Sequence, residues 1–260
     1  MISEDGAASI CQRVESQKSI PGCGGWLHRL GEPVRNFTPR KPEIKPAVEP
    51  PSLFGLWNGW YQSADFKLVM GLAEELGVDP MALDALGCCY APPHKAFAFP
   101  MRDGGNKLIG IRLRAKDGSK YSVRGSKNGL FIPQTNRATT NDWLFVVEGA
   151  SDAAAAWSMG LKVVGRPNCS ANPQMICDYV LANNIKRVVV VPDNDEPDSN
   201  GRRAGIRGAE KLEEILPVWN LEYLPPTKDL REAFRGGLSV KQIEASLKEF
   251  AWKPGVKQRE

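Results

Sequence analysis

Two stretches in the second half of the chain decide its fold, 143-WLFVVEGASDAAA-155 and 187-RVVVVPDND-195. Each opens with a run of apolar residues and then turns acidic. Two further strand-like runs lie at 161–165 and 218–224. Helical patterns lie between the strands, at 151–159, 173–183 and 203–216. Fully apolar strands that alternate with helices predict an α/β domain whose parallel sheet is covered on both faces.

Acidic residues follow two of these predicted strands. Glu148 ends the first strand, with Asp152 one turn into the next helix, and Asp193 and Asp195 follow the third strand, with Asp198 nearby. In an open parallel sheet, ligands gather beyond the carboxyl ends of the strands. Clustered carboxylates repel one another unless a cation neutralises them, and hard oxygen ligands select Mg²⁺ or Mn²⁺. Each acidic stretch alone is compatible with a turn or a solvated loop, but together they predict a divalent-metal site.

The segment before this domain concentrates positive charge. Between Lys95 and Leu130 there are nine basic residues against two acidic ones, a net charge of +7 in a chain whose net charge is +4. Strand-like runs separated by turn sequences predict a small antiparallel sheet, and they are 96-AFAFPM-101, 107-KLIGIRLR-114, 120-KYSVR-124 and 130-LFIP-133. Because side chains alternate along a strand, Arg112 and Arg114 share a face opposite the isoleucines, and Lys120 and Arg124 also point together. A cationic sheet face suits nucleic acid, although a solvated lysine-rich surface has the same pattern.

The remaining segments are predicted to flank these two parts. Residues 1–30 contain a short amphipathic stretch, and Gly31 to Ser52 form a proline-rich, semi-extended linker. Apolar spacing and capping residues predict four helices, at 63–76, from Pro80 to Leu86, after Thr227, and at 239–250.

Composition and patterning also narrow the class of protein. No run approaches the ~20 apolar residues of a membrane span, and no signal peptide is visible at the start of the chain, so we expect a cytoplasmic protein without a membrane partner. The six cysteines include no C-x-x-C pair. We therefore expect neither a disulfide framework nor zinc.

The acidic segments resemble a known signature. Together, 148-EGASD-152 and 193-DND-195 resemble the conserved acidic motifs of the TOPRIM domain. The upstream segment 97–133 resembles the basic amino-terminal part of the polymerase core of bacterial and phage DNA primases, which precedes a TOPRIM domain there. Downstream, 225-PPTKDLREAF-234 resembles the turn after the last TOPRIM strand of that group, with Arg231 where asparagine is common. The resemblance covers about residues 62–236.

This resemblance implies a fold and a division of the chain. The fold is α/β, a TOPRIM parallel-sheet domain preceded by a small basic α+β subdomain. The expected segments are an N-terminal segment and linker at 1–52, the basic subdomain at 53–140, the TOPRIM domain at 141–226, and C-terminal helices and a tail at 227–260.

The resemblance also implies an activity. The chain is expected to be a primase, which synthesises short RNA primers on a single-stranded DNA template from NTPs with Mg²⁺ or Mn²⁺. Glu148, Asp193 and Asp195 are the implied catalytic residues and metal ligands, with Asp152 and Asp198 as additional metal residues. The residues assigned to nucleic-acid or NTP binding are Arg112, Arg114, Lys120, Arg124, Lys127 and Asp229.

Two departures from the family and two alternatives remain at this point. The zinc ribbon that commonly begins such primases has no matching cysteine spacing here, and no G-x-x-x-x-G-K-[ST] loop is present, so any helicase is expected to be a separate polypeptide. The same carboxylates would serve a TOPRIM nuclease. A non-catalytic DNA-binding accessory protein of replication or recombination would use the basic face alone.

Overall fold

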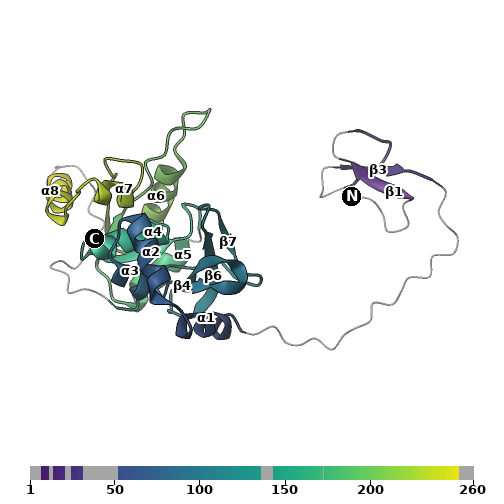
Figure 1. The fold of residues 1–260 in the computed structure, drawn as a ribbon. Helices are drawn as coiled ribbons and strands as arrows, with labels where there is room; N and C mark the ends of the chain where they lie inside the picture. The colour runs from purple at the N-terminus through teal and green to yellow at the C-terminus, as the bar shows by residue number, and fades with distance from the viewer. Residues whose placement is uncertain are drawn as a thin grey trace. The chain divides into compact units, whose positions relative to one another are not determined.

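The computed structural model describes residues 7–11, 14–20, 25–31, 52–135, 143–171 and 173–251, without the side chains of 249–251. The chain divides into two compact units, Met1–Pro50 and Pro51–Glu260 (Figure 1). Most of the predicted linker lies outside the described residues.

The first unit contains a small antiparallel sheet. Its strands are β1 (Ala8–Cys11), β2 (Ser19–Ile20) and β3 (Gly25–Arg29), in the order β1-β3-β2. The prediction of an amphipathic stretch did not include these strands. They are too short for an alternating pattern to be visible in the sequence.

The second unit begins with three helices, α1 (Leu53–Gln62), α2 (Phe66–Leu76) and α3 (Pro80–Ala85). The side chains of Ser52, Asp65 and Asp79 each cap the helix that follows by accepting a backbone N–H. The helices α2 and α3 confirm the predicted helices. Helix α1 was not predicted, because Gly55 and Gly59 interrupt its apolar pattern.

An antiparallel sheet of order β4-β5-β6-β7 follows. Its strands are β4 (Cys89–Ala91), β5 (Ala96–Arg102), β6 (Leu108–Ala115) and β7 (Lys120–Ser122), with the short 3-10 helix η1 (Pro92–His94) before β5. The predicted strand at 130–133 is wrong as a strand, because its residues form only isolated bridges. Leu130 pairs with Arg102 of β5, and Phe131 pairs with Gly165, which lies in the other sheet. This segment therefore joins the two sheets.

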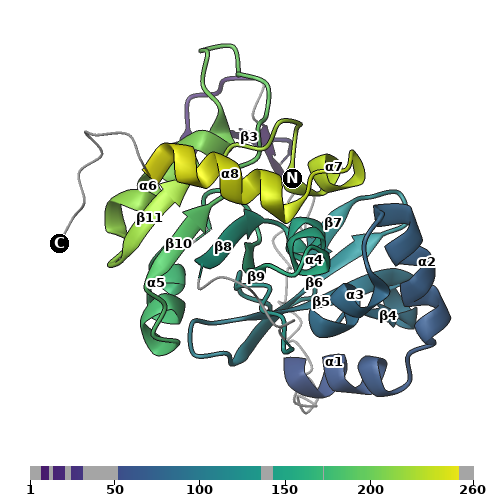
Figure 2. The same ribbon diagram turned by 90° about the vertical axis from the view of Figure 1, so that its left-hand side faces the viewer.

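The second sheet is parallel and has the order β11-β10-β8-β9, as Figure 2 shows. Its strands are β8 (Trp143–Glu148), β9 (Lys162–Arg166), β10 (Arg187–Val190) and β11 (Trp219–Glu222). The helices between and after them are α4 (Ala150–Ser158), α5 (Pro173–Ala182), α6 (Ala204–Ile215), α7 (Leu230–Arg235) and α8 (Val240–Ala251). The predicted alternation of strands and helices is confirmed, with ends that differ by a few residues.

Both faces of the parallel sheet are covered. On one face Phe145, Val147 and Val163 pack in a cluster with residues of α4, α7 and α8. On the other face Leu144 and Val146 pack in a second cluster with residues of α5 and α6. This arrangement explains the apolar interiors of β8, β9 and β10, because the inner residues of these three strands are buried.

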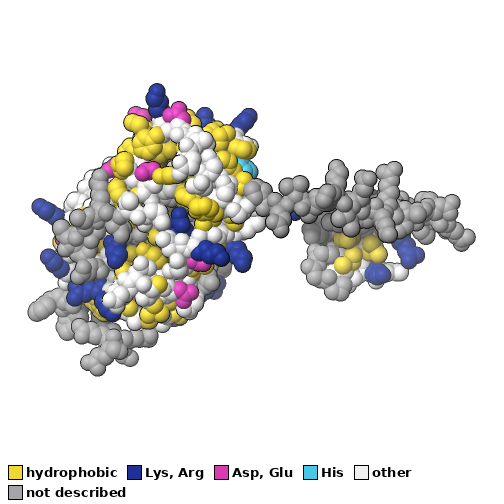
Figure 3. All heavy atoms as spheres, turned by 90° about the horizontal axis from the view of Figure 1, so that it is seen from below, with side chains coloured by type: hydrophobic (Ala, Val, Ile, Leu, Met, Phe, Trp, Pro, Cys, Tyr) yellow, Lys and Arg dark blue, Asp and Glu magenta, His cyan; other side chains and the backbone are white. Residues whose placement is uncertain are grey.

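The surface of the second unit carries scattered apolar side chains. Figure 3, which views the molecule from below, shows them interspersed with Lys and Arg. Phe54, Met70 and Met81 are among the exposed large ones, each at least half exposed. Among the described residues, no helix has the length and apolarity that crossing a membrane requires.

Candidate functional site

The acidic residues of β8 and β10 meet at one edge of the parallel sheet. The two strands are neighbours, with Val190 opposite Val146, so their carboxyl ends lie side by side. Glu148 is the last residue of β8, and Gly149 then takes a φ of 93°, a backbone conformation that favours glycine, before α4 begins. The sequence Glu-Gly therefore leaves the Glu148 side chain at the sheet edge, beside the loop that carries Asp193.

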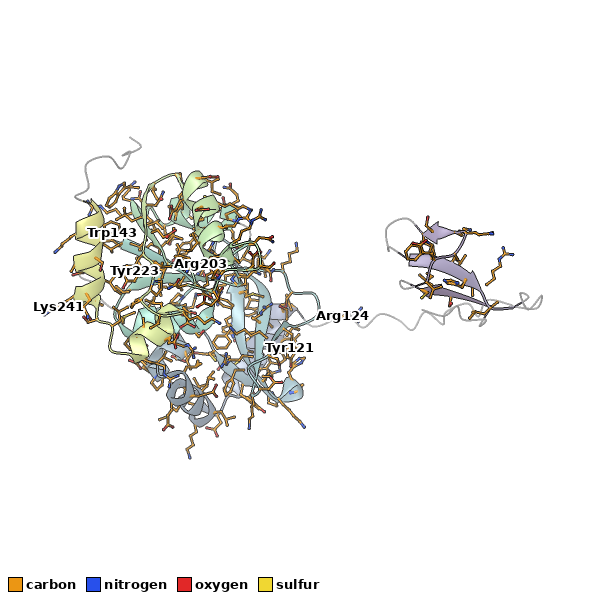
Figure 4. All side chains as sticks on the ribbon, turned by 90° about the horizontal axis from the view of Figure 1, so that it is seen from above. Tyr121, Arg124, Trp143, Arg203, Tyr223 and Lys241 are labelled. Atoms are coloured by element: carbon orange, nitrogen blue, oxygen red, sulfur yellow. The ribbon has the colours of Figure 1, made fainter. Side chains whose placement is uncertain are left out.

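A glycine in α6 positions the Asp193 loop. A Cβ added to Gly205, near the start of the helix, would collide with the backbone carbonyl oxygen of Asp193. Arg203, just before the helix, donates a hydrogen bond of 2.7 Å to the Asn194 side chain. The loop is thus held tightly between the sheet and α6. Figure 4 shows Arg203 near the middle of the second unit.

The carboxylates at this edge share one electrostatic environment. Burial, and then the charges of Asp152, Glu148, Asp195 and Asp229 in that order, together raise the pKa of Asp193 to about 8. Burial likewise raises the pKa of Glu148, against the opposing effect of a nearby arginine. Five carboxylates therefore lie close enough to repel one another, which a cation would relieve.

Asp152 is buried beneath this group, with only 4% of the residue exposed. Its Oδ1 accepts the backbone N–H of Arg231 at 3.0 Å, from the start of α7. Burial, and next the charge of Asp229, raise the pKa of Asp152 to about 7. Asp229 itself caps α7 by accepting the N–H of Glu232 at 2.7 Å. Asp229, predicted to bind nucleic acid or NTP, thus lies beside Asp152 and has a structural contact.

Arg166 is a site residue that the sequence analysis missed. It ends β9 directly opposite Glu148 in the strand register and is 1% exposed. Its guanidinium group lies 3.3 Å from Glu148 Oε1. The signal that points to it is its position after 161-LKVVG-165, because the carboxyl end of β9 lies at the same sheet edge as Glu148.

Asp195 borders an open cavity of about 770 Å³ beside the acidic group. Its Oδ1 lies 3.8 Å from the Lys228 ammonium group. Other lining residues that carry charge are Glu196, Asp198, Arg202 and Arg207. The Asp198 carboxylate accepts backbone N–H groups of Asn200 and Arg202, so it ties its own loop together, and it is not among the groups that raise the pKa of Asp193. Asp198 therefore lines the same cavity as Asp195, and its part in binding a metal ion stays a prediction.

The donor chemistry at this edge fits a divalent cation, but the side chains are not gathered into a coordination shell. Among the described residues, no three Asp, Glu, His or Cys side chains are close enough to hold one ion together. Glu148, Asp193 and Asp195 are hard oxygen donors whose mutual repulsion is only partly compensated. Residues of this kind are suited to Mg²⁺ or Mn²⁺.

The predicted basic face lies next to the acidic edge. Arg114 pairs with Lys120 across β6 and β7, and Arg112 pairs with Ser122, so these residues share one face of the antiparallel sheet. A narrow cleft is lined by residues 149–151 and by Arg112, Arg114 and Lys120. The positive charge of Lys120 also lowers the pKa of Asp152, in opposition to burial.

Two other predicted contact residues lie away from this cleft. Arg124 and Lys127 follow β7 and are exposed, and neither lines the cleft. Figure 4 shows Arg124 on an outer loop near Tyr121. Arg114 is partly engaged already, because its guanidinium group lies 3.3 Å from the Glu75 carboxylate of α2. The structure therefore brings three of the five predicted basic residues to the acidic edge.

Comparison with known proteins gives likenesses of structure alone. No protein-family model matches the chain, and no curated protein matches it. A DNA primase domain from Pseudomonas aeruginosa has a TM-score of 0.58 and 14% identity, over 75% of this chain and 78% of that one. The primase fragment of the bacteriophage T7 primase-helicase protein has a TM-score of 0.52 and 20% identity, over 67% of this chain and 72% of that one.

A third similar structure is the catalytic domain of the DnaG primase bound to single-stranded DNA. It has a TM-score of 0.54 and 15% identity, over 75% of this chain and 80% of that one. At these identities the likeness concerns the fold. Over the 67–75% of the chain that these structures cover, the chain has the fold of the bacterial and phage DNA primase catalytic core.

Proposed function

We propose that the chain is a DNA primase that synthesises short RNA primers on single-stranded DNA by metal-dependent nucleotidyl transfer. The observation that carries this proposal is the meeting of two acidic strand ends, at Glu148 and at Asp193, beside a cationic sheet face. The carboxylates suit the metal ions that nucleotidyl transfer requires, and the cations suit phosphates. The likeness to primase catalytic cores supports the same conclusion.

In the proposed reaction, the 3′-hydroxyl oxygen of one ribonucleotide bonds to the α-phosphorus of the next NTP while the bond from that phosphorus to the β-phosphate oxygen breaks. Pyrophosphate leaves, and the hydroxyl proton passes to water. Glu148, Asp193 and Asp195 would hold Mg²⁺ or Mn²⁺. When bound, the ion neutralises charge on the phosphates and on the oxygen that attacks. The chain's own part is to place these oxygens on a rigid sheet edge, where the tight Gly205 contact fixes the Asp193 loop.

Charged residues on two sides of the acidic edge would bind the substrates. Arg112, Arg114 and Lys120 in the cleft suit the phosphates of the single-stranded template. The cavity beside Asp195 is large enough for a triphosphate, and Arg202, Arg207 and Lys228 line it. We assign the incoming NTP to this cavity because it joins metal-binding carboxylates to phosphate-binding cations.

The proposal is tested by incubating the full chain with labelled NTPs, mixed-sequence single-stranded DNA and Mg²⁺ or Mn²⁺. We expect oligoribonucleotides from the wild type and at least about a hundredfold less from Asp193→Ala/Asp195→Ala, because charge neutralisation supplies most of the rate in such chemistry. Asp178→Asn is the matched control, since Asp178 is an exposed carboxylate on α5. Its product yield should equal that of the wild type.

Two alternatives give different products in the same assay. Degradation of the template by the wild type alone would establish the nuclease. DNA binding without any metal-dependent product, by wild type and variants alike, would support the accessory protein. A separate replicative helicase is the partner we would add next, and stimulation of primer yield by such a helicase is the measurement that identifies it.

A further inference from the structure

A fully buried arginine faces the acidic site. Arg166 is 1% exposed, and its guanidinium group contacts three other elements. It donates to Glu148 Oε1 and to the backbone oxygens of Cys169 and Gly208, each at 3.3 Å. Its Nε is buried and has no hydrogen-bond partner in the described structure. A buried charge of this kind costs free energy unless another charge compensates it, so Arg166 depends on Glu148.

The surrounding backbone fixes where this guanidinium group lies. A Cβ added to Gly208 of α6 would collide with the carbonyl oxygen of Cys169, so α6 approaches this carbonyl group closely only because residue 208 is glycine. The carbonyl groups of Cys169 and Gly208 both accept hydrogen bonds from the same Nη atom of Arg166. The arginine is held in one orientation, with its other Nη directed at Glu148.

The contact also occupies one oxygen of the main acidic residue at the edge. Glu148 Oε1 accepts a hydrogen bond from Arg166, and the Glu148 carboxylate also accepts one from the backbone N–H of Asp193. Asp193 also interacts electrostatically with Arg166, so the guanidinium group lies close to both acidic strand ends.

We propose that Arg166 is a built-in counter-cation that takes the place of a second divalent ion beside Glu148, so that the acidic edge binds one exchangeable metal ion. The inference rests on the metal site of the proposed function. Two-metal sites place two cations about 4 Å apart between shared carboxylates. Here a fixed guanidinium group already supplies positive charge on one side of the shared carboxylate. Arg166 is thus a positioning residue, which acts through Glu148.

The test counts Mn²⁺ ions bound to the full chain by electron paramagnetic resonance, with equilibrium dialysis as an independent count. We expect one ion per chain for the wild type and two for Arg166→Gln, which frees Glu148 Oε1 and removes a positive charge. Arg166→Lys keeps the charge and should still bind one. The control Arg187→Gln removes an exposed arginine at the opposite end of β10, and its count should match the wild type.

A second comparison separates this role from a contribution to folding alone. In Arg166→Gln/Glu148→Gln the pair is neutral, so no lone charge stays buried, and the double variant should bind the same number of ions as Glu148→Gln alone. Two ions on the wild type would overturn the inference, whether or not Arg166→Gln folds. An unchanged count in a folded Arg166→Gln would overturn it as well.

The outcomes also distinguish the inference from the proposed function. If the wild type synthesises primers and binds two ions, the primase stands and the role of Arg166 does not. If the wild type binds no Mn²⁺ at all, the proposed metal site itself fails. One ion on the wild type together with two on Arg166→Gln supports both.

Discussion

At the scale of single residues, the main feature is the crowding of carboxylates at the sheet edge. Asp193 has its pKa raised from 3.8 to about 8, and Asp152 has its pKa raised from 3.8 to about 7. Between about pH 4 and pH 8 the folded chain therefore holds protons that the unfolded chain has released. The free energy of unfolding of the metal-free protein should fall as the pH rises through this window.

Asp193→Asn should remove the part of this pH dependence that comes from Asp193 and leave the part that comes from Asp152. We expect the variant to raise the Tm of the metal-free protein at pH 8 by about 3 °C or more, because a neutral amide replaces a destabilised carboxylate. At pH 4, where Asp193 keeps much of its proton in the unfolded chain as well, the two proteins should melt at nearly the same temperature. Thermal melts in a metal chelator at both pH values measure this. An Asn variant that is less stable than the wild type at pH 8 would contradict the assigned crowding.

The acidic site residues could be predicted from the sequence because of their position at strand ends. Glu148 and Asp193 each directly follow a run of apolar residues. Arg166 follows an apolar run in the same way, but a single arginine at a strand end is common on surfaces, and its burial depends on α6 packing across it. The backbone contacts of the Asp198 carboxylate depend on a local turn that spacing alone does not reveal.

At the scale of elements, the approach of α6 to the Asp193 loop is the contact that shapes the site. Gly→Ala inside a helix ordinarily stabilises by about 0.5–1 kcal/mol. Gly205→Ala should instead destabilise the protein, by about 1–3 kcal/mol, because the added methyl group meets the backbone of Asp193. Denaturant unfolding measures the difference. Gly71→Ala in α2 is the control, since nothing lies within 4 Å of its added Cβ, and it should stabilise.

The basic face of β6 and β7 gives a second prediction at this scale. Lys120→Gln should weaken binding to single-stranded DNA to a similar degree for all sequences, and it should reduce the slope of log K against log salt by about 0.7. Fluorescence anisotropy across a salt series measures both quantities. Lys67→Gln on α2 removes an exposed charge of the same kind away from the cleft. Equal losses for both variants would show that the cleft has no special role.

The elements themselves were predicted to different degrees. The strands β8 and β10 were predicted to within a few residues, because strands buried on both faces are rich in consecutive apolar residues. The strands β9 and β11 were predicted as closely, although Lys162, Asn220 and Glu222 interrupt their apolar runs. The segment 130–133 has the same apolar character but forms only bridges, since it spans from one sheet to the other. Such a connection is decided by tertiary packing. Helix α1 could not be predicted because its glycines interrupt the apolar pattern. The helix is stabilised by packing of Trp57 on the antiparallel sheet.

At the scale of the whole molecule, the core belongs to the second unit. All three clusters of buried apolar residues among the described residues lie between Trp57 and Leu247. A chain of residues 51–260 should therefore keep the folded structure of this unit. Its Tm should lie within about 2 °C of the main transition of the full chain, since the residues removed contribute nothing to these clusters. Calorimetry of the two proteins compares them, and loss of the transition would contradict the division into units.

The central claim is that the edge formed by β8 and β10 starts RNA chains on a DNA template, and the fate of the γ-phosphate tests it most directly. Full chain is incubated with unprimed single-stranded DNA, Mn²⁺ and NTPs labelled either at the γ-phosphate or at the α-phosphate. We predict oligoribonucleotides that carry both labels, because the first nucleotide of a new chain keeps its triphosphate, and we predict that Asp195→Asn makes neither product. Products that carry only the α-label, or γ-labelled products that persist undiminished in Asp195→Asn, would contradict the account.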